Sequence, residues 1–319
     1  MSKPQYKRHD PSAPDNDPIA PLAHLKGQRP DAPDWFTEAV AARSEAGTVD
    51  VNGASISWKA WGKLGAPGLI LVHGGVAHKQ WWDALAPYLA ESRRVVALDL
   101  SGMGDSDWRD EYRMDLYARE VRAAGEAGGA FTTGKPFVIG HSFGGFVALT
   151  CSVEFGADIA GAVILDSPIR EPDKQRSSAP PQRGGKIYES LEYAVGRFRL
   201  LPHQKCESLY LLDHIARASL KEMDGGWTWK FDPNLWGKLA YARRDPAEML
   251  ARMACPVAFF RGAKTSLVTD EIWTFMRAAF PDAPMSSIPE AQHHLILDQP
   301  LAVVAALDAL MASGWGENP

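Results

Sequence analysis

Short runs of consecutive apolar residues alternate with helical patterns along most of this 319-residue chain, and this alternation limits its possible folds more than any other feature. The runs are apolar at every position instead of at every second one, which is typical of strands buried on both faces of a parallel sheet. The order of strands and helices therefore predicts an α/β fold, with a mostly parallel central sheet that helices flank on both faces.

The predicted strands start with a hairpin. Its two strands, residues 48–51 and 55–61, are separated by Asn52-Gly53, a pair that favours a tight turn. Further strands are expected at residues 68–72, 94–98, 136–139, 162–165, 257–260 and 285–288. Helical periodicity predicts helices at residues 80–91, 112–127, 144–155 and 301–313.

The connection between the strands at residues 162–165 and 257–260 is too long for an ordinary loop. It opens with a stretch rich in Pro, Gln, Arg and Ser and continues with helical patterns. We therefore expect residues 169–246 to form a helical cap, or lid, over the site. Residues 46–168 and 247–319 then make up the core of the fold.

Aromatic residues are frequent in this predicted cap, and Trp236 is among them. They suit a pocket for an apolar substrate, but such side chains serve equally well to bury the cap against the core. We predict substrate contacts for Trp227 and Trp229 of the cap and for Trp81 of the core.

The amino-acid composition indicates which partners the protein can bind and in which cellular compartment it is expected. With 45% hydrophobic residues, 23% charged residues and a formal net charge of -5, the chain can bury a core, and it carries no basic excess for nucleic acid. Its three cysteines, Cys151, Cys206 and Cys255, lie far apart and indicate neither a disulfide framework nor a zinc site. A reducing, cytoplasmic location is the simpler prediction.

The N-terminal residues 1–45 are expected to form an arm that is extended, wraps the surface or is partly disordered. Residues 1–34 are rich in Pro, Asp and Lys and lack the continuous apolar stretch of a secretory signal. No window in the chain is long and apolar enough to span a bilayer, so a soluble protein without membrane insertion is expected.

The nucleophile is predicted from the sequence Gly-His-Ser-Phe-Gly at residues 140–144. This Gly-x-Ser-x-Gly motif follows a predicted strand and opens a predicted helix, which is the context of a nucleophile elbow. Ser142 then stands on a sharp turn at the helix N-terminus, where unpaired N–H groups favour negative charge. The N–H of Phe143 is positioned to bind an oxyanion.

The second oxyanion donor is expected in the loop after the strand at residues 68–72, which reads His73-Gly74-Gly75. Gly75 is the predicted donor, with Val76 as the next choice. Two donors aimed at the developing charge each contribute roughly 10²–10³-fold in rate. His73 is interpreted as a packing residue under this loop.

A general base is expected late in the chain, after the last strand, where residues 290–294 read Glu-Ala-Gln-His-His. An imidazole with its ordinary pKa is able to take the serine proton and return it to the leaving group. From the residues alone, His293 and His294 both fit this role.

Four segments together resemble the α/β-hydrolase superfamily, and in particular its capped esterase and lipase-like members. They are residues 72–75, 99–106, 140–145 and 292–300, and they stand in that family's order. The resemblance extends from about Thr48 to the C-terminus. It implies the α/β-hydrolase fold, with a cap inserted after the strand that ends near Asp166.

The same resemblance assigns roles within these segments. It implies that His293 is catalytic and that His294 is a neighbour facing the core or the pocket. Asp99 and Asp105, in the second segment, are interpreted as turn and capping residues. Met103 stands where the family usually has histidine, so a local loop difference is expected.

The acid of the triad has two possible locations in this family. The commoner one follows the penultimate strand, but no carboxylate stands there, near Ser266. The other is the end of the strand after the elbow helix, where Asp166 stands and would hold the imidazole tautomer. We predict Asp166 as the acid, with a turn-forming role as its alternative and with Asp270 and Glu271 as replacement candidates.

These features predict a serine hydrolase that cleaves a small apolar ester, lactone or thioester through an acyl-enzyme, without cofactor or metal. A serine nucleophile argues against the branches of the superfamily that use aspartate, namely haloalkane dehalogenases and epoxide hydrolases. Cleavage of C–C bonds or amides stays open. A ligand-binding homologue without turnover is the other class, and the missing carboxylate after Gly262 favours it. The sequence predicts no oligomeric state.

Overall fold

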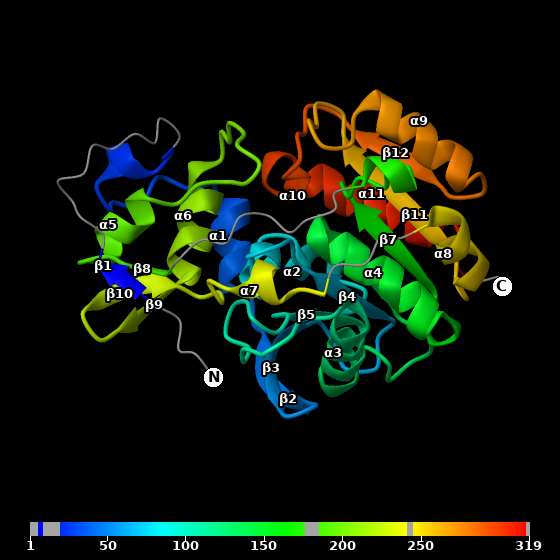
Figure 1. The fold of residues 1–319 in the computed structure, drawn as a ribbon, viewed down its shortest axis with the longest axis horizontal. Helices are drawn as coiled ribbons and strands as arrows, with labels where there is room; N and C mark the ends of the chain where they lie inside the picture. Colours follow the sequence, from blue (N-terminus) through cyan, green and yellow to red (C-terminus); the bar gives the residue numbers. More distant parts are fainter. Residues whose placement is uncertain (1–5, 9–19, 176–184, 241–244, 317–319) are drawn as a thin grey trace.

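A mixed sheet forms the centre of the computed structural model, which describes residues 6–8, 20–175, 185–240 and 245–316 (Figure 1). Within these residues the sheet has eight strands in the order β12-β11-β7-β6-β4-β5-β3-β2. Strands β12 to β5 of this order are parallel, while β3 pairs antiparallel with β5 and β2. The predicted α/β-hydrolase fold with a mostly parallel sheet is confirmed. The strands are β2 Glu45–Val51, β3 Ala54–Trp61, β4 Gly68–Val72, β5 Arg94–Leu98, β6 Phe137–His141, β7 Gly161–Leu165, β11 Val257–Gly262 and β12 Met285–Ile288.

Side chains of the inner strands alternate between two hydrophobic cores. In β4, Leu69 and Leu71 join one core, whereas Ile70 and Val72 join the other. All four side chains are buried. Because both faces of the sheet are covered, such a strand needs an apolar residue at every position, which explains the uninterrupted runs in the sequence.

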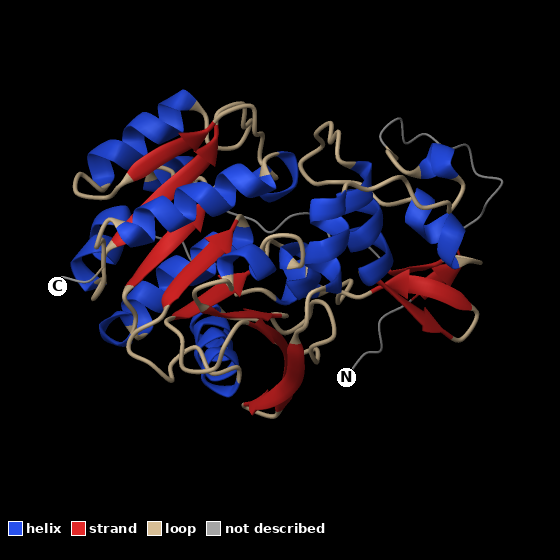
Figure 2. Cartoon of the chain, turned by 180° about the vertical axis from the view of Figure 1, so that it is seen from behind, coloured by secondary structure: helices blue, strands red, loops and turns tan. Residues whose placement is uncertain are grey.

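Helices cover both faces of the sheet (Figure 2). Helices α3 (Met114–Ala127), α4 (Phe143–Glu154) and α9 (Asp270–Ala279) contribute to one core, and α2 (Ala86–Leu89) and α11 (Pro300–Ala312) contribute to the other. The helix expected at residues 80–91 is divided into η2 (Lys79–Trp82) and α2, because Pro87 has no N–H to continue a helix and stands at the start of α2. Among the described residues, every helix falls short of the length and apolar character that a membrane crossing requires.

Most of the insertion between β7 and β11, from β8 to β10, lies beside the sheet at one end of the molecule, whereas its last helix, α8, lies next to β11 (Figures 1 and 2). It is not purely helical as expected, because three short strands accompany its helices. The β9–β10 pair is antiparallel, and β8 instead pairs with β1 (Tyr6–Arg8) near the N-terminus. Residues 176–184 and 241–244 of the predicted cap lie outside the described residues. The described elements are η4 Pro172–Lys174, β8 Gly185–Ile187, α5 Leu191–Gly196, α6 Leu209–Ala218, β9 Leu220–Met223, β10 Gly226–Trp229, α7 Leu235–Lys238 and α8 Pro246–Arg252.

The N-terminal segment differs from the expected extended arm. It contains η1 (Ala23–Leu25) and α1 (Asp34–Ala41), and α1 packs between the core and the insertion. The Phe36 ring lies 4.9 Å from the Tyr210 ring of α6, measured between centroids, and the Tyr88 hydroxyl of α2 donates to the Trp35 carbonyl oxygen at 2.9 Å. Contacts among these aromatic residues, of which Phe36 is buried, hold the segment in place. Residues 1–5 and 9–19 of the arm lie outside the described residues.

A buried polar contact ties the insertion to the core. The Tyr112 hydroxyl, just before α3, donates to Asp232 Oδ2 at 2.8 Å, and Lys238 Nζ lies 2.7 Å from the same oxygen. The Asp232 N–H donates to the Gly102 carbonyl oxygen at 2.8 Å. Both Tyr112 and Asp232 are buried, so these bonds fix one side of the insertion against the loop after β5.

We expect Tyr112→Phe to lower the free energy of unfolding by about 1.5–3 kcal/mol, because the buried Asp232 carboxylate loses a hydroxyl donor. Urea denaturation followed by circular dichroism measures this difference. Tyr210→Phe is the control, since that ring acts in the Phe36 contact. Equal unfolding free energies for the two variants would contradict the role assigned to the hydroxyl.

Candidate active site

Ser142 stands at the sharp turn between β6 and α4. Its backbone has a φ of 55° and a ψ of -116°, a conformation that residues other than glycine rarely adopt. Close packing holds the turn: a Cβ at Gly140 would overlap the carbonyl oxygen of Gly144, and one at Gly144 would overlap the backbone of Val72 and His73. The glycines of the motif are therefore required by contact between backbones.

Hydrogen bonds also fix the backbone of Ser142. Its N–H donates to the Leu165 carbonyl oxygen at 2.8 Å, and its own carbonyl oxygen accepts from the Ser167 hydroxyl at 2.6 Å. The end of β7 thus holds the serine from one side. The Ser142 side chain is only partly buried, which leaves its hydroxyl accessible for reaction.

His293 links the serine to a carboxylate. Its Nε2 lies 3.0 Å from Ser142 Oγ, and its Nδ1 lies 2.7 Å from Asp166 Oδ2. Because a carboxylate only accepts, Nδ1 carries the proton, and Nε2 is left with its lone pair towards the serine hydroxyl. The imidazole is buried and the Asp166 side chain is fully buried. Ser142, His293 and Asp166 thus form one continuous series of hydrogen bonds.

Asp166 follows the last residue of β7 directly. Its Oδ1 accepts the N–H of Gly262 at 3.0 Å, and its Oδ2 also accepts from the Thr265 hydroxyl at 2.7 Å. The loop after β11, where the sequence offers no carboxylate, therefore donates to Asp166 instead. Donors at both oxygens stabilise a charged carboxylate in a buried place.

The replacement candidates for the acid lie elsewhere. Asp270 begins α9 and pairs with Arg261 at 2.6 Å, with its side chain 93% exposed. Glu271 pairs with Lys174 at 3.0 Å, also on the surface. Neither carboxylate shares a hydrogen bond with His293, whose Nδ1 is already bonded to Asp166.

Gly75 and Phe143 lie next to each other beside Ser142. A Cβ at Gly75 would lie 3.5 Å from the Phe143 Cβ and 2.8 Å from the Trp236 ring. The hydrogen bonds of the described residues include none donated by the N–H of Gly75 or of Phe143. The N–H of Val76, by contrast, donates to Met103 Sδ at 3.2 Å. Gly75 is thus the better placed of the two predicted donors.

His73 supports this loop from below, as the sequence predicted. Its Nδ1 lies 2.7 Å from the carbonyl oxygen of Gly74, and its Nε2 accepts the N–H of Leu100 at 3.1 Å. The ring is fully buried, and burial lowers its pKa. Both nitrogens are engaged, so the ring fastens the loop after β4 to the loop after β5.

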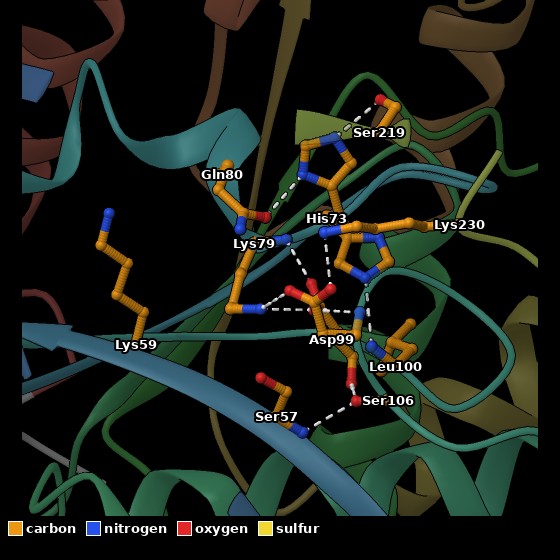
Figure 3. A network of polar contacts seen from close by, with 12 residues as sticks. Ser57, Lys59, His73, Lys79, Gln80, Asp99, Leu100, Ser106, Ser219 and Lys230 are labelled. Atoms are coloured by element: carbon orange, nitrogen blue, oxygen red, sulfur yellow. Dashed lines mark hydrogen bonds and ion pairs between the residues drawn. The ribbon is translucent and has the colours of Figure 1, made fainter. Parts of the chain in front are cut away.

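A buried charge network extends from this point, as Figure 3 shows. Lys79 Nζ lies 2.6 Å from Asp99 Oδ2 and 2.8 Å from Asp105 Oδ2, and Lys230 of the insertion lies 2.6 Å from Asp105 Oδ1. Burial alone would lower the pKa of Lys79, but the two carboxylates outweigh it and raise that pKa. Asp99 and Asp105, expected only as turn and capping residues, thus also join the core to the insertion.

His78 makes a second link to the insertion. Its Nε2 lies 2.8 Å from the Ser219 hydroxyl, and its Nδ1 lies 2.7 Å from Gln80 Oε1. The ring is buried, and this burial lowers its pKa to about 4. A neutral imidazole therefore fills this position at neutral pH.

The predicted substrate-binding tryptophans have different surroundings. Trp81 lies beside the site, with its ring 5.6 Å from the His294 ring between centroids. Trp229 packs against Tyr188 and Phe198 within the insertion, and Trp227 lies next to it on β10. Both side chains are partly buried and pack against one of the two hydrophobic cores, so their contact with substrate stays a prediction.

Two residues at the site were not singled out from the sequence. The Trp236 ring stands edge-on to Phe143, with centroids 5.6 Å apart. Gln204 accepts the His294 N–H at 2.9 Å through Oε1, and its Nε2 donates to Asp298 at 3.0 Å, which braces the histidine loop. The sequence showed Trp236 as one of many aromatic residues in the predicted cap but gave no reason to choose it. Gln204 belongs to no recognisable sequence motif.

The comparisons with known proteins agree with this architecture. A family model described as the alpha/beta hydrolase family matches residues 69–307. The chain is 25% identical over 267 residues to Esterase Rv0045c of Mycobacterium tuberculosis, a match that covers 80% of this chain and 85% of the relative. It is 27% identical over 235 residues to the bifunctional esterase/perhydrolase DCH of Acinetobacter calcoaceticus, covering 69% and 82% of the two chains.

A solved structure supports the fold itself. The crystal structure of Esterase Rv0045c superposes with a TM-score of 0.66 at 19% sequence identity, covering 89% of this chain and 99% of that chain. At this identity, the likeness shows a shared fold.

Lowering the pH should weaken folding through His78. The unfolded imidazole takes up a proton near pH 6.5, whereas the folded one stays neutral down to a pKa of about 4. Between these values the unfolded state binds more protons, so stability falls as the pH falls, by on the order of 3 kcal/mol for the full interval. His78→Gln removes this contribution. Its destabilisation relative to wild type, measured by urea denaturation, should therefore be smaller at pH 4.5 than at pH 7.

His24→Gln serves as the control, because His24 is exposed and lies outside this network. A destabilisation by His78→Gln that is the same at both pH values would contradict the proposed burial of a neutral ring.

Proposed function

The chain belongs to the alpha/beta-hydrolase family and is a hydrolase that acts on esters, and on this premise we propose that it works through a Ser142–His293–Asp166 triad. The observation that carries the proposal is the unbroken series of hydrogen-bond distances, 3.0 Å from serine to histidine and 2.7 Å from histidine to aspartate. An acyl-enzyme on Ser142 is its intermediate.

Acylation begins when Ser142 Oγ attacks the ester carbonyl carbon and gives its proton to Nε2 of His293. The imidazolium that forms is stabilised by Asp166, which stays ionised and holds the ring in the required tautomer. His293 then returns the proton to the alkoxide as the C–O bond breaks, and the alcohol leaves. A water molecule then gives a proton to the same imidazole and attacks the acyl carbon. The bond to Ser142 Oγ breaks as His293 returns this proton to Oγ, and the carboxylic acid leaves.

The oxyanion of each tetrahedral intermediate is bound, in this proposal, by the N–H groups of Gly75 and Phe143. Both lie beside Ser142, and neither donates to another protein atom in the described part of the chain. Phe143 also opens α4, whose N-terminal dipole favours negative charge. Donors that are fixed in advance act without reorganisation during the reaction.

Trp236 and Trp81 are the proposed walls of the pocket for the apolar part of the ester. Trp236 contacts both Gly75 and Phe143, and Trp81 lies against His294. The insertion, which supplies Trp236, is therefore the proposed cap. Free thiols at all three cysteines favour the reducing, cytoplasmic location predicted from the sequence.

A ligand-binding protein without turnover is the second candidate. Its support was the absence of a carboxylate after Gly262. That support weakens because Thr265 and Gly262 of this loop both donate to Asp166, which in turn holds His293. A loop with this arrangement needs no acid of its own.

Substitutions in the proposed triad test the proposal. Ser142→Ala should abolish labelling by a fluorophosphonate probe and lower kcat for a p-nitrophenyl ester by about 10⁶-fold, since the nucleophile is lost. Asp166→Asn should lower kcat by about 10⁴-fold, because the amide favours the wrong imidazole tautomer. Asp270→Asn is the matched control and should keep near-full activity. Loss of activity in Asp270→Asn with retention in Asp166→Asn would overturn the assignment of the acid.

Trp236→Ala should lower kcat/KM for an apolar ester by about tenfold, equivalent to ~1.4 kcal/mol of lost contact, while fluorophosphonate labelling of Ser142 continues. Trp229→Ala is the comparison, since that ring packs within the insertion. If Trp229→Ala has the larger effect on kcat/KM with an unchanged unfolding free energy, the pocket wall has been misassigned.

A further inference from the structure

The loop that carries His293 is held between the core and the insertion. It lies between β12 and α10 (Leu295–Asp298), and α10 stands on the side of the core that faces the insertion (Figure 1). The His293 carbonyl oxygen accepts a hydrogen bond from Nε2 of His141, which ends β6, at 2.9 Å. The N–H of the same peptide group belongs to His294 and donates to Gln204 Oε1 at 2.9 Å. The core thus fixes one end of this peptide group, and the insertion fixes the other.

Gln204 acts on this loop at two points. It lies between α5 and α6 of the insertion, and its Nε2 lies 3.0 Å from both carboxylate oxygens of Asp298. Asp298 Oδ2 in turn accepts the N–H of Gln292 at 2.7 Å. The two ends of the amide therefore hold the backbone on both sides of His293. One end bonds His294 directly, and the other acts on Gln292 through Asp298.

The position of the loop depends on these contacts. Among the described residues, the hydrogen bonds include no second acceptor for the His294 N–H. Only 4% of His294 is exposed, and a buried donor that loses its acceptor is costly, so the loop would move to satisfy it. Another hydrogen bond joins the same two segments, because Gln292 Nε2 donates to the Lys205 carbonyl oxygen at 3.1 Å. The loop therefore follows the insertion.

We propose that Gln204 is a positioning residue that holds His293 within proton-transfer reach of Ser142, so that docking of the insertion also places the general base. This role rests on the proposed function. His293 Nε2 lies 3.0 Å from Ser142 Oγ. A displacement of about 1 Å from such a geometry lowers the rate by about 10²-fold. Gln204 acts through the backbone beside His293 and not through the pocket walls, so its loss should lower kcat and leave KM nearly unchanged.

A reversed hydrogen bond tests this role. Gln204→Glu keeps an acceptor for the His294 N–H but sets a second carboxylate against Asp298. At pH 8 it should lower kcat for a p-nitrophenyl ester by about ten- to hundredfold. In the double variant Gln204→Glu/Asp298→Asn, the introduced amide donates to the introduced carboxylate, and its oxygen still accepts from Gln292. This variant should recover kcat to within about threefold of wild type, with KM close to wild type in both variants.

Gln28→Glu is the matched control, because it makes the same chemical change at an exposed glutamine and should keep wild-type kcat. Urea denaturation of each variant checks that folded proteins are compared. If Gln204→Glu does not fold, Gln204→Met fills a similar volume without an acceptor and should also lower kcat. Wild-type kcat in the folded single variant, or a folded double variant that does not recover kcat, overturns the positioning role.

His293→Ala is measured in the same assay, so that failure of this inference is distinguished from failure of the proposed function. An inactive His293→Ala together with wild-type kcat in the Gln204 variants overturns the positioning role alone. Wild-type activity in His293→Ala would contradict the proposed function, and the positioning role with it.

Discussion

The left-handed turn at Ser142 is the constraint on which the rest of the site depends. A residue with a side chain adopts a φ of 55° only where its surroundings compensate for the strain. Here that compensation is close backbone packing: Gly140 approaches Gly144, and Gly144 approaches the end of β4. The same approach carries the loop after β4 against α4 and so sets Gly75 beside Phe143. The position of the proposed oxyanion donors and the exposure of the serine side chain are therefore consequences of one local conformation.

A second constraint holds the insertion in a fixed position relative to that turn. Lys230 and Ser219 of the insertion reach a buried network around Lys79, Asp99 and His78, while Asp232 accepts from Tyr112. Buried charges of this kind are costly unless every partner is present, because removing one leaves an unpaired ion in a dry place. They therefore fix a single docking position more than they add stability. Trp236 stays over Gly75 because its segment is fastened on both sides, through Asp232 and Lys238.

The sequence predicted those features that local chemistry determines. Buried strands and the elbow each follow from a pattern within a few residues, and the structure has the strands and the Ser142 turn where they were expected. His293 was chosen over His294 only through the resemblance to the family, because the residues alone fit both. Asp166 also came from that resemblance, because no local pattern tells which strand end faces His293, and the position of β7 between β6 and β11 decides it. Features that depend on tertiary packing were missed. The number of aromatic residues could not show which of Trp227, Trp229 and Trp236 lies at the site. That depends on the orientation of the insertion, which no local pattern determines. Helix α1 was missed because its order comes from contacts with Tyr210 and Tyr88, far along the chain.

Dehydration connects the proposed reactivity of this site with the state of the two histidines beside it. A hydrogen bond between His293 and Asp166 is stronger where water is excluded, and the fully buried carboxylate shows that exclusion. The same exclusion removes water from His141 and His294, and it keeps both rings neutral. The catalytic candidate His293 therefore faces no positive charge from the two histidine rings beside it. The same exclusion of water thus strengthens the hydrogen bonds of His293 and keeps its neighbouring rings uncharged.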